Sequence, residues 1–318
     1  MEKITIIVPV LNEEGNLRLL FQKLNNLKYK LKSEVFIDFI FVNDGSVDKT
    51  ESILAELAEK FNYFKFISFT RNFGHQQSIS AGINFSDSDY VVTMDADLQD
   101  PPELIEDMYY LSKTGYDVVY AQRESREGES FFKIFTAKIF YKFINFICDL
   151  NIPKDTGDYR LITKKVVVEF KKFKEKHKFI RGLIPWLGFK STYIIFKRQK
   201  RYSGVTNYNF TKMMSFAIDA SLSFSTRPLI YLSNLGIFFI ILSITYASFI
   251  LYKKIFLDQI IPGFTTILLF IIFFGGLNLF FLGILGQYIS KIFEQSKNRP
   301  EYIIKELKNF STDIKSSI

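Results

Sequence analysis

Two aspartates separated by one residue, Asp95 and Asp97, directly follow the hydrophobic segment 90–94. Alternate residues of an extended chain point to the same side, so both carboxylates can reach one point in space. Two carboxylates with a neighbouring amide or water suit an octahedral Mg²⁺ or Mn²⁺ that holds a diphosphate. A single D-x-D pair is also typical of a solvated turn, here one before a helix that starts near Pro101. The pair alone therefore leaves a metal site and a polar turn open as alternatives.

Polar residues also follow three other hydrophobic segments. They are Asn12-Glu13 after 4–10, Asn43-Asp44 after 35–42, and Arg71-Asn72 after 64–69. The hydrophobic segments alternate with stretches in which apolar residues have helical spacing, such as 13–27 and 74–85. This alternation predicts an α/β fold in which a mainly parallel sheet has helices on both faces. Because such sheets bind ligands at the carboxyl ends of their strands, the sequence predicts a nucleotide site where the polar residues converge.

The usual nucleotide-binding loops do not occur in the sequence. No G-x-G-x-x-G follows the first hydrophobic segment, and no G-x-x-x-x-G-K-[ST] is found anywhere. Dinucleotide dehydrogenases and P-loop enzymes are therefore poor candidates. The single cysteine, Cys148, excludes a disulfide framework and a multi-cysteine zinc site, so any metal should have oxygen ligands.

Charge is distributed unevenly along the 318 residues. The net charge is +8, yet residues 1–120 hold 11 Lys+Arg against 19 Asp+Glu, and 121–318 hold the remaining 30 against 14. The basic second part is expected to face phosphate or anionic lipid. Nucleic acid is not expected as a partner, because this same part contains two long apolar segments.

The two apolar segments are long enough to cross a membrane. Residues 229–252 and 259–290 carry no charge, and the second helix is expected to start near 264, after Pro262-Gly263. A 24-residue helix reaches about 36 Å, against roughly 30 Å of hydrocarbon in a bilayer. Buried core helices are the alternative, but they are seldom uncharged for so long. Basic residues after 290 place both outer ends of this hairpin on the cytoplasmic side of the plasma membrane.

The sequence thus divides into four parts. Residues 1–210 are expected to form the soluble α/β domain, 211–228 an amphipathic juxtamembrane helix, 229–290 two transmembrane helices at about 229–252 and 264–290, and 291–318 a basic cytoplasmic tail. Since 229–290 lie outside the strand–helix alternation, a chain ending at Thr226 is expected to keep its nucleotide site.

Several motifs occur in order at plausible spacings. In the first half they are 8–14 (VPVLNEE), 42–46 (VNDGS), 71–76 (RNFGHQ) and 94–102 (MDADLQDPP); later come 155–161 (DTGDYRL), 180–189 (IRGLIPWLGF), 201–204 (RYSG) and the hairpin. Together they resemble glycosyltransferase family 2, with its GT-A fold. The later motifs are similar to the polyprenyl-phosphate glycosyltransferase branch, which includes bactoprenol glucosyltransferases and dolichyl-phosphate mannose synthase. The ordered set is far more specific than any one motif.

The resemblance implies roles for the residues at matching positions. The nucleotide-sugar positions are Pro9, Leu11, Glu13, Asp44, Asp95 and Gln99, and the metal positions, for Mg²⁺ or Mn²⁺, are Asp95, Asp97 and Gln99. The catalytic positions are Asp155, Asp158 and Arg160, with each carboxylate left open as weak base, sugar ligand or orienter of an arginine. Relatives often carry two aspartates where this chain has Asn43-Asp44, so the contacts of Asn43 are open. His75 is expected to be structural rather than catalytic.

A polyprenyl phosphate is the acceptor that the resemblance implies. A phosphate monoester has a second pKa of about 6, so it is already an anionic nucleophile near pH 7. The site then needs cations more than it needs a base, and arginine can bind phosphate through two parallel hydrogen bonds. The candidates are Arg123, Arg126 and Arg201. Each could instead form a surface ion pair, above all Arg126 beside Glu127 and Glu129.

The resemblance therefore implies an inverting hexosyltransferase of the cell envelope. It would move one hexose from a nucleotide sugar, with UDP favoured, to undecaprenyl phosphate on the cytoplasmic membrane face, and a homo-oligomer is left open. A polysaccharide synthase is one alternative, but such relatives carry a Q-x-x-R-W element, and the only tryptophan here is Trp186 in a different context. A non-catalytic membrane protein that binds nucleotide sugar or acts as a scaffold is the other alternative. Intact Asp95, Asp97, Gln99 and Arg160 argue against it.

Overall fold

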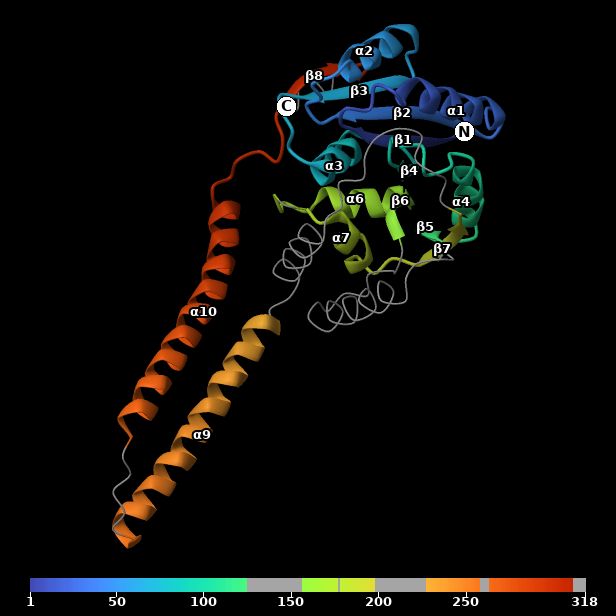
Figure 1. Cartoon of the computed structure of the whole chain (residues 1–318). Coiled ribbons are helices and arrows are strands. Elements are labelled where there is room, and N and C mark those ends of the chain that lie inside the picture. Colours follow the sequence, from blue (N-terminus) through green and yellow to red (C-terminus); the bar gives the residue numbers. More distant parts are fainter. Residues whose placement is uncertain (125–155, 177, 198–226, 258–262, 311–318) are drawn as a thin grey trace. The chain divides into compact units, whose positions relative to one another are not determined.

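The computed structural model describes residues 1–124, 156–176, 178–197, 227–257 and 263–310 (Figure 1). The chain divides into two units. The first comprises 1–134, 150–208 and 299–318, and the second comprises 135–149 and 209–298. Each unit is described by itself below.

The first unit is built around a mixed, mainly parallel sheet of eight described strands, in the order β7-β5-β6-β4-β1-β2-β3-β8. The strands are β1 (Glu2–Val10), β2 (Val35–Asn43), β3 (Phe64–Phe69), β4 (Tyr90–Thr93), β5 (Val118–Arg123), β6 (Thr156–Thr163), β7 (Ser191–Phe196) and β8 (Ile304–Lys308). Strand β6 runs antiparallel to β4 and β5, and β8 runs antiparallel to β3. The other neighbours are parallel.

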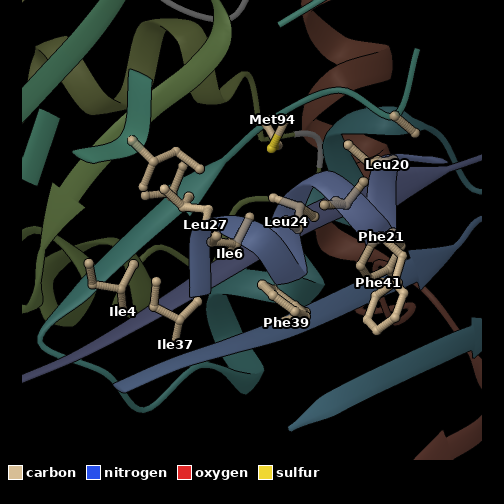
Figure 2. Close-up of a cluster of buried hydrophobic side chains, with 14 of the residues drawn as sticks. Ile4, Ile6, Leu20, Phe21, Leu24, Leu27, Ile37, Phe39, Phe41 and Met94 are labelled. Carbon is tan, nitrogen blue, oxygen red and sulfur yellow. The ribbon is translucent and has the colours of Figure 1, made fainter. Parts of the chain in front are cut away.

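Helices cover both faces of this sheet, as the alternation predicts. They are α1 (Leu17–Lys30), α2 (Thr50–Lys60), α3 (His75–Phe85), α4 (Leu104–Lys113), α6 (Lys164–Lys171) and α7 (Ile180–Trp186). Ile4 and Ile6 of β1 belong to the core that the apolar side of α1 joins (Figure 2). Ile7 points the opposite way and lies so close to α3 that a Cβ on Gly82 would be 2.3 Å from its Cγ2. Because both faces are covered, β1 and β2 are almost continuously buried.

Strand β6 is the element that the strand–helix alternation does not reveal. It inserts antiparallel between β4 and β5, with Arg160 opposite both Thr93 and Tyr120. Its sequence, TGDYRLIT, contains two charged residues, and both Asp158 and Arg160 are buried. A strand with buried charges lacks the apolar pattern that marks the parallel strands.

The segment after the apolar hairpin differs from the expected tail, because residues 304–308 form the edge strand β8 of the first unit. Tyr302 stacks on Phe69 with ring centroids 5.0 Å apart, and its hydroxyl accepts a hydrogen bond from Asn84. Lys178, which is buried, donates to Glu301 at 2.5 Å. Three of the five residues of β8 (IKELK) are charged, so its composition resembles a solvated tail.

Replacing Glu301 by Gln should destabilise the first unit. Lys178 would be left buried without its counter-charge, which costs about 3–5 kcal/mol for a fully buried pair. Glu301 keeps 17% of its side-chain exposure, so we expect about 2 kcal/mol. Lys308→Ala is the matched control in the same segment, since its pair with Glu306 is exposed and should contribute about 0–1 kcal/mol. Denaturant unfolding in detergent measures both, and equal stability of the two variants would contradict the buried pair.

The second unit contains two long apolar helices, α9 (Arg227–Leu257) and α10 (Phe264–Ser296). Within them, Leu229–Tyr246 and Phe270–Ser296 are long and apolar enough to cross a membrane, each with a mean hydropathy of 1.9. No described side chain in these windows is buried inside the protein. Helix α10 extends six residues beyond the expected end at 290. Residues 211–226 of the expected juxtamembrane helix (211–228) lie outside the described residues, and its last two residues belong to α9.

Candidate functional site

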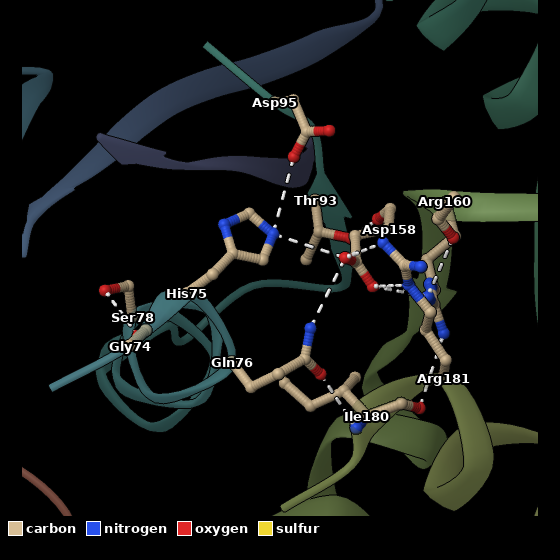
Figure 3. A network of polar contacts seen from close by, with 11 residues as sticks. Gly74, His75, Gln76, Ser78, Thr93, Asp95, Asp158, Arg160, Ile180 and Arg181 are labelled. Atoms are coloured by element: carbon tan, nitrogen blue, oxygen red, sulfur yellow. Dashed lines mark hydrogen bonds and ion pairs between the residues drawn. The ribbon is translucent and has the colours of Figure 1, made fainter. Parts of the chain in front are cut away.

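Two of the residues predicted for the site, Asp95 and Asp158, lie near each other at the carboxyl end of β4. Asp95 follows β4, and Asp158 of the neighbouring β6 lies close by (Figure 3). His75, at the start of α3, links them: its Nε2 is 3.5 Å from Asp95 Oδ1 and 3.2 Å from Asp158 Oδ2. Thr93 Oγ1 donates to the backbone carbonyl of Asp158, which ties β4 to β6 at this point.

Asp158 is held by several cationic and polar side chains. Its side chain is only 1% exposed. Arg181 donates from Nε to Oδ1 at 3.0 Å and from Nη2 to Oδ2 at 2.7 Å. Arg160 Nη2 donates to Oδ1 at 3.1 Å, and Gln76 Nε2 lies 3.4 Å from Oδ2. Burial alone would raise the pKa of Asp158, but Arg181, His75 and Arg160 hold that pKa well below its usual value.

Arg160 is an internal residue of this network. Its side chain is 2% exposed, and its guanidinium also donates to the backbone carbonyl of Gly157 at 3.0 Å. Burial lowers the pKa of Arg160, while the Asp158 carboxylate opposes that shift. Arg160 was predicted at a catalytic position, and its described hydrogen bonds are all with protein groups.

Arg181 is more accessible than Arg160, and it was not among the predicted site residues. Its side chain retains 29% exposure while it is paired with Asp158. Gln76 supports its helix, because the Gln76 side-chain oxygen accepts from the backbone N–H of Ile180 at 3.0 Å. The one available signal is that Arg181 belongs to the motif at 180–189.

His75, predicted to be structural, lies between the carboxylates of Asp95 and Asp158. Its side chain is 44% exposed. Desolvation lowers its pKa, but the hydrogen bond with Asp158 and the charge of Asp95 outweigh this, so the pKa of His75 is raised. Gly74, with φ of +120°, directs the chain into α3 and so places His75 at the site.

The D-x-D pair fits a hard cation. Asp95 Oδ1 is buried and makes no hydrogen bond, which leaves a carboxylate oxygen directed into a polar site. Asp97 is 5% exposed, and its Oδ1 accepts from the backbone N–H of Gln99 at 3.1 Å. Leu98 between them has φ of +60°, a left-handed turn that brings this N–H to the carboxylate. Within the described part of the chain, no group of three or more His, Cys, Asp or Glu could hold a metal, so any cation here would need amide, water or ligand oxygens as well.

Asp44 anchors a loop on the side where nucleotide was expected. It is 3% exposed and accepts from the backbone N–H groups of Phe73 at 2.7 Å and Gly74 at 3.0 Å. Burial raises the pKa of Asp44, while the two N–H groups oppose the shift. Gly45 is required beside it: its φ is +70°, and a Cβ there would lie 2.4 Å from the Arg71 carbonyl carbon.

The other positions predicted to bind the nucleotide differ in their burial and their contacts. Pro9 is buried in β1 opposite Val42, and Leu11 is 41% exposed. Glu13 accepts from Asn16 Nδ2 at 2.5 Å. Asn43, whose contacts were open, is fully buried: it donates to Ser68 and accepts from the Ser46 N–H.

Of the predicted acceptor arginines, the structure describes Arg123 alone. It ends β5, and its Nη2 would lie 2.9 Å from a Cβ placed on Gly157, so glycine makes room for the guanidinium beside β6. Asp155, Arg126 and Arg201 lie outside the described residues.

Acid should weaken the fold through Asp158. Its pKa is lower in the folded protein than the unfolded value of about 3.9. Its stabilising contribution is therefore complete above the unfolded pKa, and it is lost as the pH falls from about 4 toward the folded pKa. We expect unfolding midpoints of the wild type to drop more steeply with acid below pH 4 than those of Asp158→Asn. Parallel curves would contradict the ion pairing of Asp158.

Known proteins similar to this chain identify its family. Residues 5–170 match the family described as Glycosyl transferase family 2. An uncharacterized glycosyltransferase of Synechocystis (sll0501) is 41% identical over 96% of this chain and 95% of its own length. The bactoprenol glucosyl transferase of Shigella phage SfV is 35% identical over 96% and 99%. A solved structure of glucosyl-3-phosphoglycerate synthase from Mycobacterium tuberculosis has a TM-score of 0.46 at 13% identity, covering 70% of this chain and 78% of that one. The sequence similarities and the mixed, mainly parallel sheet confirm the predicted GT-A architecture, and this chain belongs to glycosyl transferase family 2.

Proposed function

We propose that this glycosyltransferase moves a single hexose from a nucleotide sugar to a polyprenyl phosphate at a membrane. The observation that carries the proposal is the similarity to bactoprenol glucosyl transferases, which extends over 96% of the chain and so includes the apolar hairpin. Two helices long enough to cross a membrane agree with a lipid acceptor.

On the donor side, we assign Asp95, Asp97 and Gln99 to a divalent cation, Mg²⁺ or Mn²⁺, and to the donor diphosphate. Support comes from the buried Asp95 oxygen that lacks a hydrogen bond and from the hard-oxygen character of the set. Such a cation would neutralise charge on the diphosphate leaving group. The nucleotide base and ribose are assigned to the side of Pro9, Leu11, Glu13 and Asp44, with UDP the favoured nucleotide.

The acceptor phosphate would act as the nucleophile without a base. One of its oxygens bonds to the anomeric carbon as the bond from that carbon to the donor diphosphate breaks, which releases nucleoside diphosphate and inverts the anomeric centre. No proton has to move, because the phosphate is already ionised near pH 7. We assign cationic binding of this phosphate to Arg181, which is partly exposed, and to Arg123, Arg126 and Arg201.

Three roles were left open for Asp158: weak base, sugar ligand and orienter of an arginine. The role of orienter suits it best. Both carboxylate oxygens are occupied by cationic or polar donors, and its lowered pKa makes it a poor proton acceptor. It would fix Arg181 in position. Asp155 keeps its proposed catalytic role, and Arg160 acts through Asp158.

The membrane arrangement belongs to the same proposal. Helices α9 and α10 would form a transmembrane hairpin in the plasma membrane, with the first unit in the cytoplasm. The basic residues after α10 favour this orientation. Because β8 belongs to the first unit, the chain would return to the cytoplasmic side after the second span.

Donor preference and acceptor dependence can be tested together. Purified full-length protein in detergent is mixed with a panel of nucleotide sugars, with and without undecaprenyl phosphate and Mg²⁺. We expect nucleoside diphosphate release from a UDP-hexose only when lipid phosphate and cation are both present. Equal release without the lipid would point to hydrolysis or another acceptor. Binding of nucleotide sugar with no release under any condition would favour a non-catalytic binding protein.

A further inference from the structure

An exposed aromatic pair stands on the first unit at the end of α7. Trp186, the only tryptophan of the chain, is 61% exposed. It packs edge-on against Phe173, with ring centroids 5.7 Å apart. A tryptophan left this open on a folded domain loses the hydrophobic stabilisation that burial would give it. The exposed pair is therefore a candidate contact surface for another molecule.

Basic residues are frequent in the segment that contains the pair, although Lys178 and Arg181 are paired with Glu301 and Asp158. Residues 164–190 contain nine Lys and Arg against two Glu. Lys172 and Lys174 flank Phe173 in the sequence and are exposed. Lys172 also pairs with Glu169 at 2.7 Å, but an exposed pair of this kind contributes little. We call Lys172, Phe173, Lys174 and Trp186 the Trp186 face.

We propose that the Trp186 face contacts the surface of an anionic lipid bilayer. The indole ring combines an apolar body with an N–H donor, which is why tryptophan is enriched at the level of lipid headgroups. Each nearby lysine would strengthen association with anionic lipid by about fivefold. The proposal rests on the membrane hairpin proposed above, since a tethered domain meets the surface at high effective concentration, and even a weak contact would then be populated.

This contact would bring the site toward the headgroups, because one helix carries both. Helix α7 begins at Ile180 and ends at Trp186. Arg181, bound to Asp158, is five residues before Trp186, which is about 8 Å along a helix axis. At 3.6 residues per turn the two side chains also point about 140° apart around that axis, so the contact would bring the partly exposed arginine close to headgroup level without placing it against the bilayer. The Trp186 face would orient the first unit as well as anchor it.

The single tryptophan provides a direct test that needs no turnover. The full chain is placed in lipid nanodiscs that contain phosphatidylglycerol, and its emission is quenched either by brominated acyl chains or by aqueous iodide. Nanodiscs leave both membrane faces open to iodide. We expect bromolipid to remove most Trp186 emission and iodide to remove little.

The matched control moves the reporter to another part of the first unit. Tyr29 of α1 is 58% exposed, close to the exposure of Trp186. In a Trp186→Phe background, Tyr29→Trp should be quenched by iodide and unaffected by bromolipid. The same behaviour from Trp186 itself would overturn the proposal. Protection of Trp186 from both quenchers would also overturn it, and would point to a second copy of the chain on this face.

A charge-reversal variant tests the requirement for anionic lipid. Lys172→Glu with Lys174→Glu should weaken bromolipid quenching of Trp186 in phosphatidylglycerol discs and make iodide more effective. Wild type in discs of neutral phosphatidylcholine should resemble this variant. Equal bromolipid quenching in all three samples would overturn the role of the lysines. The readout does not involve sugar transfer, so it can fail while the proposed reaction holds.

Discussion

Replacing Asp95 by Asn is expected to lower the rate of sugar transfer about 10²–10³-fold while the protein remains folded. The buried Oδ1 of Asp95 makes no hydrogen bond and has His75 Nε2 3.5 Å away, so it retains capacity to bind a cation. The substitution removes its charge but keeps its shape. Steady-state transfer at saturating donor and acceptor measures the loss, and thermal unfolding measures the fold. Asp97→Asn should behave similarly, because it removes the other carboxylate charge of the pair.

Asp87→Asn is the matched control for these variants. Asp87 precedes β4 as Asp95 follows it, but its side chain is 83% exposed and lies 3.7 Å from Lys164. Its activity should equal that of the wild type. Near-normal transfer by Asp95→Asn, or full wild-type activity in excess chelator, would remove the metal from the account.

Asp158→Ala should destabilise the protein by about 3–5 kcal/mol, because it leaves the buried Arg160 without its counter-charge. Arg160 is 2% exposed, so water cannot replace the carboxylate. The isosteric Asp158→Asn keeps part of the hydrogen bonding and should fold well enough for kinetics. Denaturant unfolding of both variants, beside Asp87→Asn, measures the difference.

A double-mutant cycle separates orientation of Arg181 from proton transfer by Asp158. If Asp158 acts by holding Arg181, then Arg181→Ala should cause most of the loss seen in Asp158→Asn. The double variant should then be little worse than either one, because the two residues work as a unit. Arg18→Ala, at an exposed ion pair with Glu56, is the control. Additive losses would assign Asp158 a separate role, such as that of a base.

The parallel part of the fold could be predicted because its local and global signals agree. Segments such as 4–10 and 35–42 are covered on both faces and therefore read as continuous apolar runs. Asp95 and Asp97 could be placed at a strand end for the same reason. Strand β6 was not predicted, because Asp158 and Arg160 neutralise each other's charge inside the protein. No local sequence pattern reveals such a contact.

The C-terminal strand shows a second limit of sequence reasoning. β8 is separated from β3 by more than 200 residues, and its charged residues resemble a solvated tail. Its contacts alter the expectation for a chain ending at Thr226, which would lose Tyr302 from Phe69 and Glu301 from Lys178. A shortened chain therefore tests more than the loss of the hairpin.

Side-chain partners were also harder to predict than element positions. Asp48 and Glu51 have the spacing of a capping box at the start of α2, and Asp48 Oδ1 does accept from the Thr50 N–H at 3.0 Å. Glu51 instead accepts from Lys305 of β8, a strand that was not predicted. Likewise, the Asp44 carboxylate binds the backbone N–H groups of the 71–74 loop. In both cases the partner comes from a distant segment.

The mass of the lipid product distinguishes transfer of a single hexose to a polyprenyl phosphate from the other activities. Full-length protein in bilayers containing undecaprenyl phosphate is supplied with the preferred nucleotide sugar and Mg²⁺, and the extracted lipids are analysed by mass spectrometry. We expect undecaprenyl phosphate that carries one hexose, formed in proportion to the nucleoside diphosphate released and absent with Asp95→Asn. A glycan chain of several sugars, or nucleotide release with no sugar on the lipid, would contradict this expectation.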